Sequence, residues 1–166
     1  LKRLRGTPIA RHTVEHRMMY DPEPPYTVRE TAVVDTATMQ RFTRFSRYWD
    51  LVANSGRFKQ GLTLLLDAPG GIHKAAEAKS VDQDSPFHAF ANFADWLWTR
   101  YEKTRHTTSG ITPETLVDAL FIYLSVERGL EENVVRNALL ADYLSSGARA
   151  SPECLRGHLS GRTNSG

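Results

Sequence analysis

Two histidines and a glutamate near the amino terminus have the residue types and the spacing of a metal site. His12, Glu15 and His16 fit the pattern H-x-x-E-H, in which two histidines four residues apart bind zinc and the glutamate activates a water molecule. Such a site requires a long helix and a third ligand from elsewhere in the chain, whereas this pattern lies between Pro8 and Pro22. We therefore interpret it as a short surface helix with two solvated histidines, and keep a small zinc hydrolase as an alternative function.

Arginines alternate with aromatic residues between residues 41 and 49. Arg41, Arg44 and Arg47 are three residues apart, and such a basic and aromatic mixture can hold phosphates and stack bases. The net charge is only +2, so no wider basic surface is expected and nucleic acid is not the expected partner. Because the guanidinium fork pairs with carboxylates in a fixed geometry, we predict docking onto acidic groups. The candidate docking or binding surface consists of Arg41, Arg44, Arg47, Tyr48, Trp49, Asp50 and Trp96.

The sequence contains none of the common catalytic motifs. It has no Gly-rich phosphate loop, no G-x-S-x-G elbow and no Asp/Glu set at metal-binding spacing. Its single cysteine, Cys154, excludes an internal disulfide framework and cannot hold an iron–sulfur cluster, which needs several thiolates. A position near a helix start could lower the pKa of this thiol, but no base is placed beside it by sequence. We predict no catalytic, cofactor-binding or metal-binding residue in this chain.

The candidate surface lies mainly on the first of several predicted helices. This helix begins at Asp35 or Thr36, either of which can cap it, and ends near Ser55, since Gly56 can adopt a left-handed conformation. Its periodicity predicts an outward side and an inward side. The outward side carries Arg44, Arg47 and Asp50, and the inward side carries Met39, Phe42, Phe45, Trp49 and Val52.

The later helices share a common start signal. A hydroxyl residue precedes a proline at residues 85–86, 112–113 and 151–152, and this combination is typical of helix N-termini. Two further helices are predicted, one with apolar residues spaced over residues 58–66 and one from Glu131 to Ser146. In the helix that starts at Ser85, the predicted inward side is Phe87, Phe90, Ala94, Leu97 and Tyr101.

These elements predict an all-α fold, an irregular bundle of about five helices with an extended proline-rich N-terminal arm. The arm covers residues 1–34, where residues 26–34 could be extended but have no partner strand. The helical domain covers residues 35–156, and residues 157–166, rich in Ser and Gly, are predicted to be a disordered tail. Trp96 and Trp98 lie on different sides of their helix, so one of them could contact a partner.

Several segments, taken in order, resemble a known family. FSRYWD at residues 45–50 and NSGRF at 54–58 are similar to the start of the uncharacterised C-terminal domain that follows the catalytic barrel in many bacterial cobalamin-binding radical SAM proteins. LKRLRGTPI at residues 1–9 resembles the end of the barrel, and YDPEPPY at 20–26 resembles the crossing segment. SPF at residues 85–87, leading to DWL at 95–97, fits the same order.

This resemblance implies a role within a larger enzyme. The parent protein would use S-adenosylmethionine, an iron–sulfur cluster and cobalamin, and the partner of this chain would be the radical SAM barrel of the same polypeptide. Neither the Cys-x-x-x-Cys-x-x-Cys motif of that family nor its Asp-x-His-x-x-Gly motif occurs here, so no cofactor is expected in this chain. The implied role is a non-catalytic accessory domain that covers the barrel, or helps to bind substrate or a partner.

Composition sets the remaining expectations. Hydrophobic residues make up 40% of the 166 residues and charged residues 24%, as in globular domains. No apolar run has the length of a signal peptide or a membrane span, so we expect a cytoplasmic protein without a membrane partner. The chain starts at Leu1 instead of Met, which suggests a fragment, and the isolated fragment could form a homodimer. A free-standing helical adaptor that binds a protein or nucleic acid through Arg41, Arg44 and Arg47 is the other alternative.

Overall fold

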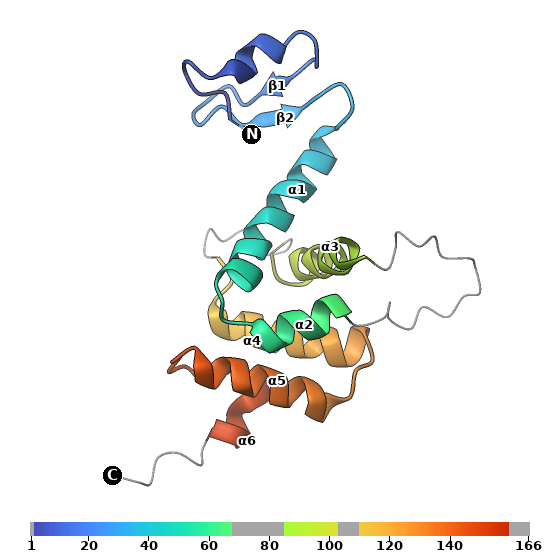
Figure 1. Cartoon of the computed structure of the whole chain (residues 1–166), viewed down its shortest axis with the longest axis vertical. Helices are drawn as coiled ribbons and strands as arrows, with labels where there is room; N and C mark the ends of the chain where they lie inside the picture. The colour runs from blue at the N-terminus through green and yellow to red at the C-terminus, as the bar shows by residue number, and fades with distance from the viewer. Residues whose placement is uncertain (1, 68–84, 103–109, 160–166) are drawn as a thin grey trace, which may run out of the picture. The chain divides into compact units, whose positions relative to one another are not determined.

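The protein is mostly helical. The computed structural model describes residues 2–67, 85–102 and 110–159, and it divides into two compact units, Leu1–Ser46 and Arg47–Gly166. The all-α prediction is confirmed. The α-helices of the described residues are α1 (Thr36–Trp49), α2 (Lys59–Asp67), α3 (Pro86–Leu97), α4 (Pro113–Ile122), α5 (Glu132–Ser145) and α6 (Arg156–Leu159) (Figure 1). None of these helices is long and apolar enough to cross a membrane.

The unit Leu1–Ser46 contains a small antiparallel sheet that sequence analysis missed. β1 (Met19–Tyr20) pairs with β2 (Val28–Glu30), and Lys2 forms an isolated bridge with Thr27. A short 3-10 helix, η1 (Pro8–His12), precedes the sheet. We predicted no partner for residues 26–34, and this was wrong because the chain reverses between residues 21 and 27 and brings two short segments together. Val28, only 1% exposed, is the buried apolar residue of this sheet.

The predicted helix starts are confirmed where the capping side chain lies in the first turn of its own helix. Asp35 Oδ1 accepts a hydrogen bond from the Thr38 N–H at 2.8 Å, as an N-cap should. Ser85 and Thr112 likewise accept from the backbone N–H groups three residues later, at 3.3 and 3.2 Å. The Glu131 carboxylate accepts from the first N–H groups of α5. Each of these caps joins residues within one turn, which is why the sequence reveals them.

Among the described residues, three helices continue beyond their α-helical part as π-helical turns. These turns are η2 (Asp50–Asn54) after α1, η4 (Trp98–Glu102) after α3, and η5 (Tyr123–Glu127) after α4. The first helical run therefore ends where we predicted, next to Gly56, whose φ is +69°.

The inward sides of two helices were predicted only in part. Val52 is buried as expected, but Phe42 is 47% exposed and Tyr48 is 0% exposed. The buried side of the first helical run therefore includes Tyr48 and excludes Phe42, so it is rotated around the helix axis relative to the predicted side. Phe87 was also placed inward and is 50% exposed, because it lies in the first turn of α3, before the helix enters the core.

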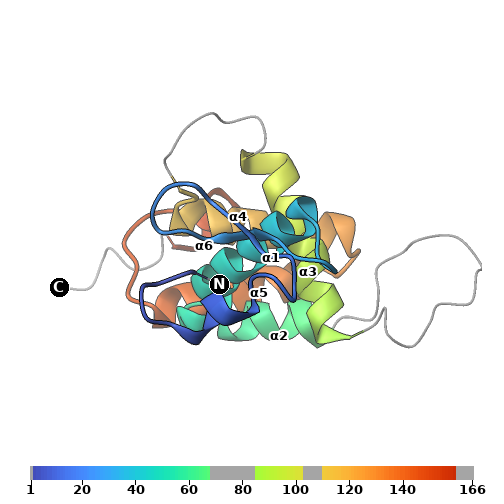
Figure 2. The ribbon, with the colours of Figure 1, turned by 90° about the horizontal axis from the view of Figure 1, so that it is seen from above.

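In the unit Arg47–Gly166, α2 lies between α3 and α5, and α4 packs on α5 (Figures 1 and 2). The close approach of α2 to α5 depends on Gly61, because a Cβ there would lie 2.9 Å from Leu139 Cδ2. Apolar side chains from each helix fill the space between them. They include Leu65, Phe90, Phe93, Leu97, Leu116, Leu120, Leu124, Val135 and Leu139.

A buried carboxylate joins α2 to α5. Asp142, 4% exposed, accepts hydrogen bonds from the backbone N–H groups of Gln60 at 3.0 Å and Gly61 at 2.8 Å. These N–H groups lie in the first turn of α2, where they have no partner within the helix and carry partial positive charge. Asp142 thus caps a helix that starts more than eighty residues earlier in the chain.

The end of the described chain departs from prediction. The predicted cap at Ser151 is not made; the 3-10 helix η6 (Glu153–Leu155) starts without a side-chain cap from its own N-cap residue. Asp118 of α4 instead accepts from the N–H groups of Glu153 and Cys154, at 3.1 and 2.9 Å. The prediction of disorder from residue 157 is wrong for residues 157–159, which belong to α6 and follow the fully buried Leu155. The remainder of the predicted tail, residues 160–166, lies outside the described residues.

We expect Asp142→Ala to lower the free energy of unfolding by about 2–4 kcal/mol, since it leaves two N–H groups at a buried helix end without an acceptor. Urea titration followed by circular dichroism measures the change. Asn137→Ala, an exposed position on the same helix, is the control and should change the stability by less than about 0.5 kcal/mol. Equal effects of the two substitutions would contradict the structural role of Asp142.

Candidate functional site

The predicted docking surface is divided between exposed and internal residues. Tyr48 is fully buried, so its inclusion in the surface was wrong. Its hydroxyl donates to Glu102 Oε2 at 2.9 Å, and a tyrosine in this position packs in the core because its one polar atom has a partner.

Arg47 forms an internal ion pair. Its Nη1 and Nη2 donate to the two carboxylate oxygens of Glu102 at 2.9 and 2.7 Å. The bidentate arrangement that we predicted for a partner is therefore made within the chain. The side chain of Glu102 is 12% exposed and that of Arg47 is 45% exposed, so the outer edge of the guanidinium still faces solvent.

The two tryptophans of the predicted surface belong to an aromatic cluster. Trp49 contacts Phe90 edge to face, with ring centroids 4.9 Å apart. Trp96 contacts the ring of Tyr123 at 5.2 Å and donates from Nε1 to Glu127 Oε1 at 3.1 Å. Both rings are half-buried. They cover the edge of the core, and part of each ring faces solvent.

Three members of the candidate surface remain, namely Arg41 and Arg44 in the unit Leu1–Ser46 and Asp50 in the unit Arg47–Gly166. Arg41 and Asp50 are exposed, and Arg44 is half-buried. Asp50 Oδ1 accepts from Asn54 Nδ2 at 2.6 Å. Arg44 lines an open polar hollow of about 390 Å³ within the unit Leu1–Ser46. The other lining residues are Asp21, Thr27, Val28, Arg29, Thr36, Met39, Gln40 and Thr43.

The structure brings the three residues of the H-x-x-E-H pattern together. His12 Nδ1 lies 3.3 Å from Glu15 Oε2, and His16 Nε2 lies 3.9 Å from the same oxygen. All three residues are exposed. The 3-10 helix η1 ends at His12, so the pattern does not lie on a long helix, and the potential ligand group found among the described residues consists of these three alone.

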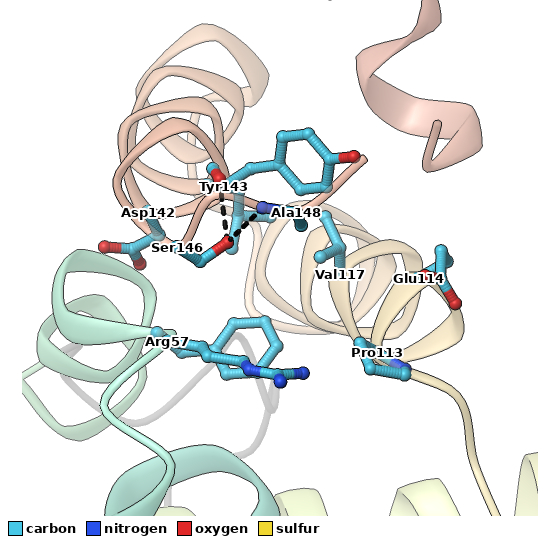
Figure 3. Close-up of a pocket in the computed structure, with 10 residues that line it drawn as sticks. Arg57, Pro113, Glu114, Val117, Asp142, Tyr143, Ser146 and Ala148 are labelled. Carbon is cyan, nitrogen blue, oxygen red and sulfur yellow. Dashed lines mark hydrogen bonds between the residues drawn. The ribbon is translucent and has the colours of Figure 1, made fainter. Parts of the chain in front are cut away.

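A small pocket lies between α4, α5 and the two residues that precede α2, Arg57 and Phe58 (Figure 3). Its volume is about 20 Å³, room for roughly one water molecule. Arg57 lies on one side and Tyr143 on the other, with Val117 between α4 and α5. Ser146 Oγ donates to the Tyr143 carbonyl oxygen at 2.8 Å and accepts from the Ala148 N–H at 3.4 Å.

The polar groups of this pocket do not form a catalytic arrangement. Asp142 is bound to the start of α2 and Ser146 is bound to backbone. The Tyr143 hydroxyl is buried and has no hydrogen-bond partner among the described residues. Burial raises the pKa of Tyr143, and the nearby negative charge of Glu114 adds to this shift. The phenol therefore stays neutral and is not an activated nucleophile.

Cys154 is a half-buried thiol. Burial and a hydrogen bond from the thiol to Asp118 raise its pKa far above the ordinary range. A helix start could have lowered this pKa, but the Asp118 carboxylate beside the thiol opposes ionisation. A neutral thiol is a poor nucleophile and a poor metal ligand.

Sequence analysis missed the acidic residues that organise these contacts. Asp118, Asp142, Glu102 and Glu127 each accept a hydrogen bond from a residue at least thirty positions away. The sequence did indicate the role of Asp142. This residue lies at helical spacing from the buried residues Val135, Ala138 and Leu139, and it is therefore an acidic residue on the apolar face of its helix. Glu102 and Glu127 had no such signal.

We expect Glu102→Ala to lower the free energy of unfolding by about 1–3 kcal/mol, because the buried Tyr48 hydroxyl loses its acceptor. Tyr48→Phe should destabilise the natural protein but stabilise the Glu102→Ala variant, since it removes an unsatisfied hydroxyl. Urea unfolding of the two single variants and the double variant measures the coupling. Glu132→Ala, which breaks an exposed ion pair with Arg136, is the control and should change little. Additive effects would show that Tyr48 and Glu102 do not interact.

We also expect Cys154 to react slowly with a disulfide reagent at pH 8. The raised pKa leaves little thiolate in the folded protein, and the thiolate is the reactive form. The rate in urea should approach that of glutathione, because unfolding removes both burial and the Asp118 contact. A folded protein that reacts as fast as the unfolded chain would contradict the shielding of this thiol.

Comparison with known proteins gives one family. Residues 14–165 match the profile of a family described as "Protein of unknown function (DUF4080)". The searches of curated proteins and of solved structures find no match. Since the matched residues include nearly the whole chain, the protein belongs to this family of proteins of unknown function, DUF4080.

Proposed function

We propose that this chain is a non-catalytic helical accessory domain of a cobalamin-binding radical SAM iron–sulfur enzyme. The ordered resemblance of residues 1–9, 20–26, 45–58 and 85–97 supports the link to that enzyme class. Membership of DUF4080, a family of proteins of unknown function, does not contradict this role. The domain would cover the barrel, or contribute to substrate or partner binding.

The observation that carries the non-catalytic role is the use of acidic side chains inside the unit Arg47–Gly166. Asp142 and Asp118 cap helices, and Glu102 holds Arg47 and Tyr48. A carboxylate that is fully engaged in such bonds is not available as a general acid or base, because that role requires reach to a substrate proton. The pocket of about 20 Å³ is also smaller than ordinary small-molecule sites.

The residues of this chain do not fit the cofactors of the parent enzyme. An iron–sulfur cluster requires several thiolates, whereas Cys154 is the only cysteine and its pKa is raised. The sequence has no cobalamin-binding Asp-x-His-x-x-Gly segment. In this proposal the barrel and its cobalamin domain hold these groups, and the present chain contributes surface.

Arg41, Arg44 and Asp50 are the proposed docking residues. Arg41 and Arg44 lie in α1 within the unit Leu1–Ser46, and Asp50 lies in η2 within the unit Arg47–Gly166. Charged groups of this kind fix the orientation of a partner better than they supply affinity. Arg47 contributes only the outer edge of its guanidinium, because Glu102 takes both of its inner N–H groups.

The first experiment is to sequence the open reading frame that lies upstream of the codon for Leu1. The full-length protein that this reading frame encodes is then purified without oxygen. We expect a three-cysteine cluster motif upstream, stoichiometric iron, and binding of cobalamin and S-adenosylmethionine. A frame that begins at Leu1 and yields a metal-free protein would overturn the radical SAM proposal and favour the adaptor.

The docking residues are tested in the same full-length protein. Arg41→Glu with Arg44→Glu should increase protease cleavage between the barrel and this domain, since the charge reversal repels acidic groups on the barrel. Arg149→Glu reverses an exposed charge outside the proposed surface and is the control. Identical cleavage of all three proteins would contradict docking through this surface, even if the cofactor analysis succeeds.

A further inference from the structure

The H-x-x-E-H residues have a geometry that a hydrolase would not need. In the hydrolase motif the glutamate is a base and a distant third ligand completes the metal site. Here Glu15 Oε2 lies 3.3 Å from His12 Nδ1 and 3.9 Å from His16 Nε2, and the ligand atoms of the three residues lie within 4.8 Å of one another. Glu15 Oε2 thus lies near a ring nitrogen of each histidine.

These distances are close to those of a metal site. Three atoms bound to one zinc ion at about 2.0–2.2 Å in a tetrahedral arrangement lie roughly 3.4 Å apart. The two histidine–glutamate distances, 3.3 and 3.9 Å, lie around this value. The side chains of His12 and His16 are both 53% exposed, so small ring rotations can close the remaining separation without moving the core.

The backbone that carries the three side chains is held in place. The His16 N–H donates to the His12 carbonyl oxygen at 3.0 Å, which closes one turn between the two histidines. The Ala32 N–H donates to the His16 carbonyl oxygen at 2.8 Å and ties this turn to the chain that follows β2. Thr13 Oγ1 is 3.0 Å from the Tyr20 hydroxyl. The ligands therefore start from a fixed turn, which lowers the entropy lost on binding.

We propose that His12, Glu15 and His16 bind one divalent transition-metal ion. Two imidazole nitrogens favour zinc, nickel, cobalt or copper over magnesium and calcium, which prefer oxygen ligands. The exposure of all three side chains leaves further coordination positions to water. The role of Glu15 as a ligand separates this site from the hydrolase alternative, in which the glutamate must stay off the metal.

This inference is independent of the proposed accessory role. The site lies within the unit Leu1–Ser46, and His12 precedes the residues that match the family. A radical SAM parent neither requires nor excludes such a site. Loss of one proposal leaves the other unchanged.

The test is calorimetric titration of the untagged 166-residue chain with zinc. We expect one zinc ion per chain with micromolar affinity. His12→Ala, Glu15→Gln and His16→Ala should each weaken binding by roughly tenfold or more, since even changes around bound ligands weaken metal sites by 10–100-fold. His158→Ala, at an exposed histidine outside this unit, is the matched control and should bind as the natural chain does.

Two further readouts separate the site from a simple hydrogen-bonded cluster. Zinc should shift the ring nitrogen resonances of His12 and His16 and leave those of His158 unchanged. Magnesium at the same concentration should not displace zinc. Unchanged affinity in the His12 and His16 variants, shifts at His158 alone, or displacement by magnesium would each overturn the proposal. Circular dichroism of the variants should match the natural chain, because the three side chains are exposed.

Discussion

The helical unit depends on the bond between Asp142 and the first turn of α2. A buried carboxylate is costly unless it is hydrogen-bonded, and a buried helix end is costly unless its N–H groups have acceptors. Asp142 meets both requirements at once through Gln60 and Gly61. Gly61 favours this contact, because a Cβ there would lie 2.9 Å from Leu139 Cδ2 and would force either that buried side chain or α2 to shift. The α2–α5 contact is thus fixed in register, which apolar packing alone would leave free to slide.

The same principle operates at other helix ends in this unit. Asp118 caps the start of η6, and Glu102, the last residue of η4, joins it to the last turn of α1. Glu127 accepts from the Trp96 indole and fixes the edge of the aromatic cluster. The internal polar groups of this unit therefore hold its helices together.

The sequence predicted the contacts that join residues within one helical turn of each other. Asp35, Ser85 and Thr112 cap their own helices, so residue type and spacing were sufficient. The β1–β2 pairing and the burial of Tyr48 depend on residues brought together by the fold, and the predictions that concerned them were wrong. The same holds for the candidate surface. Helical spacing predicted the exposure of Arg47 and Asp50, whereas the pairing of Arg47 with Glu102 depends on the tertiary structure.

The shielding of Cys154 has a consequence for association in solution. Two copies of the chain could be linked covalently only through this thiol, since it is the single cysteine. Its burial and its contact with Asp118 keep it protonated, so air oxidation of the folded protein is slow. A dimer of the folded chain would then be held by non-covalent surface contacts. Dilution alone would separate its two copies, and no reducing agent would be needed.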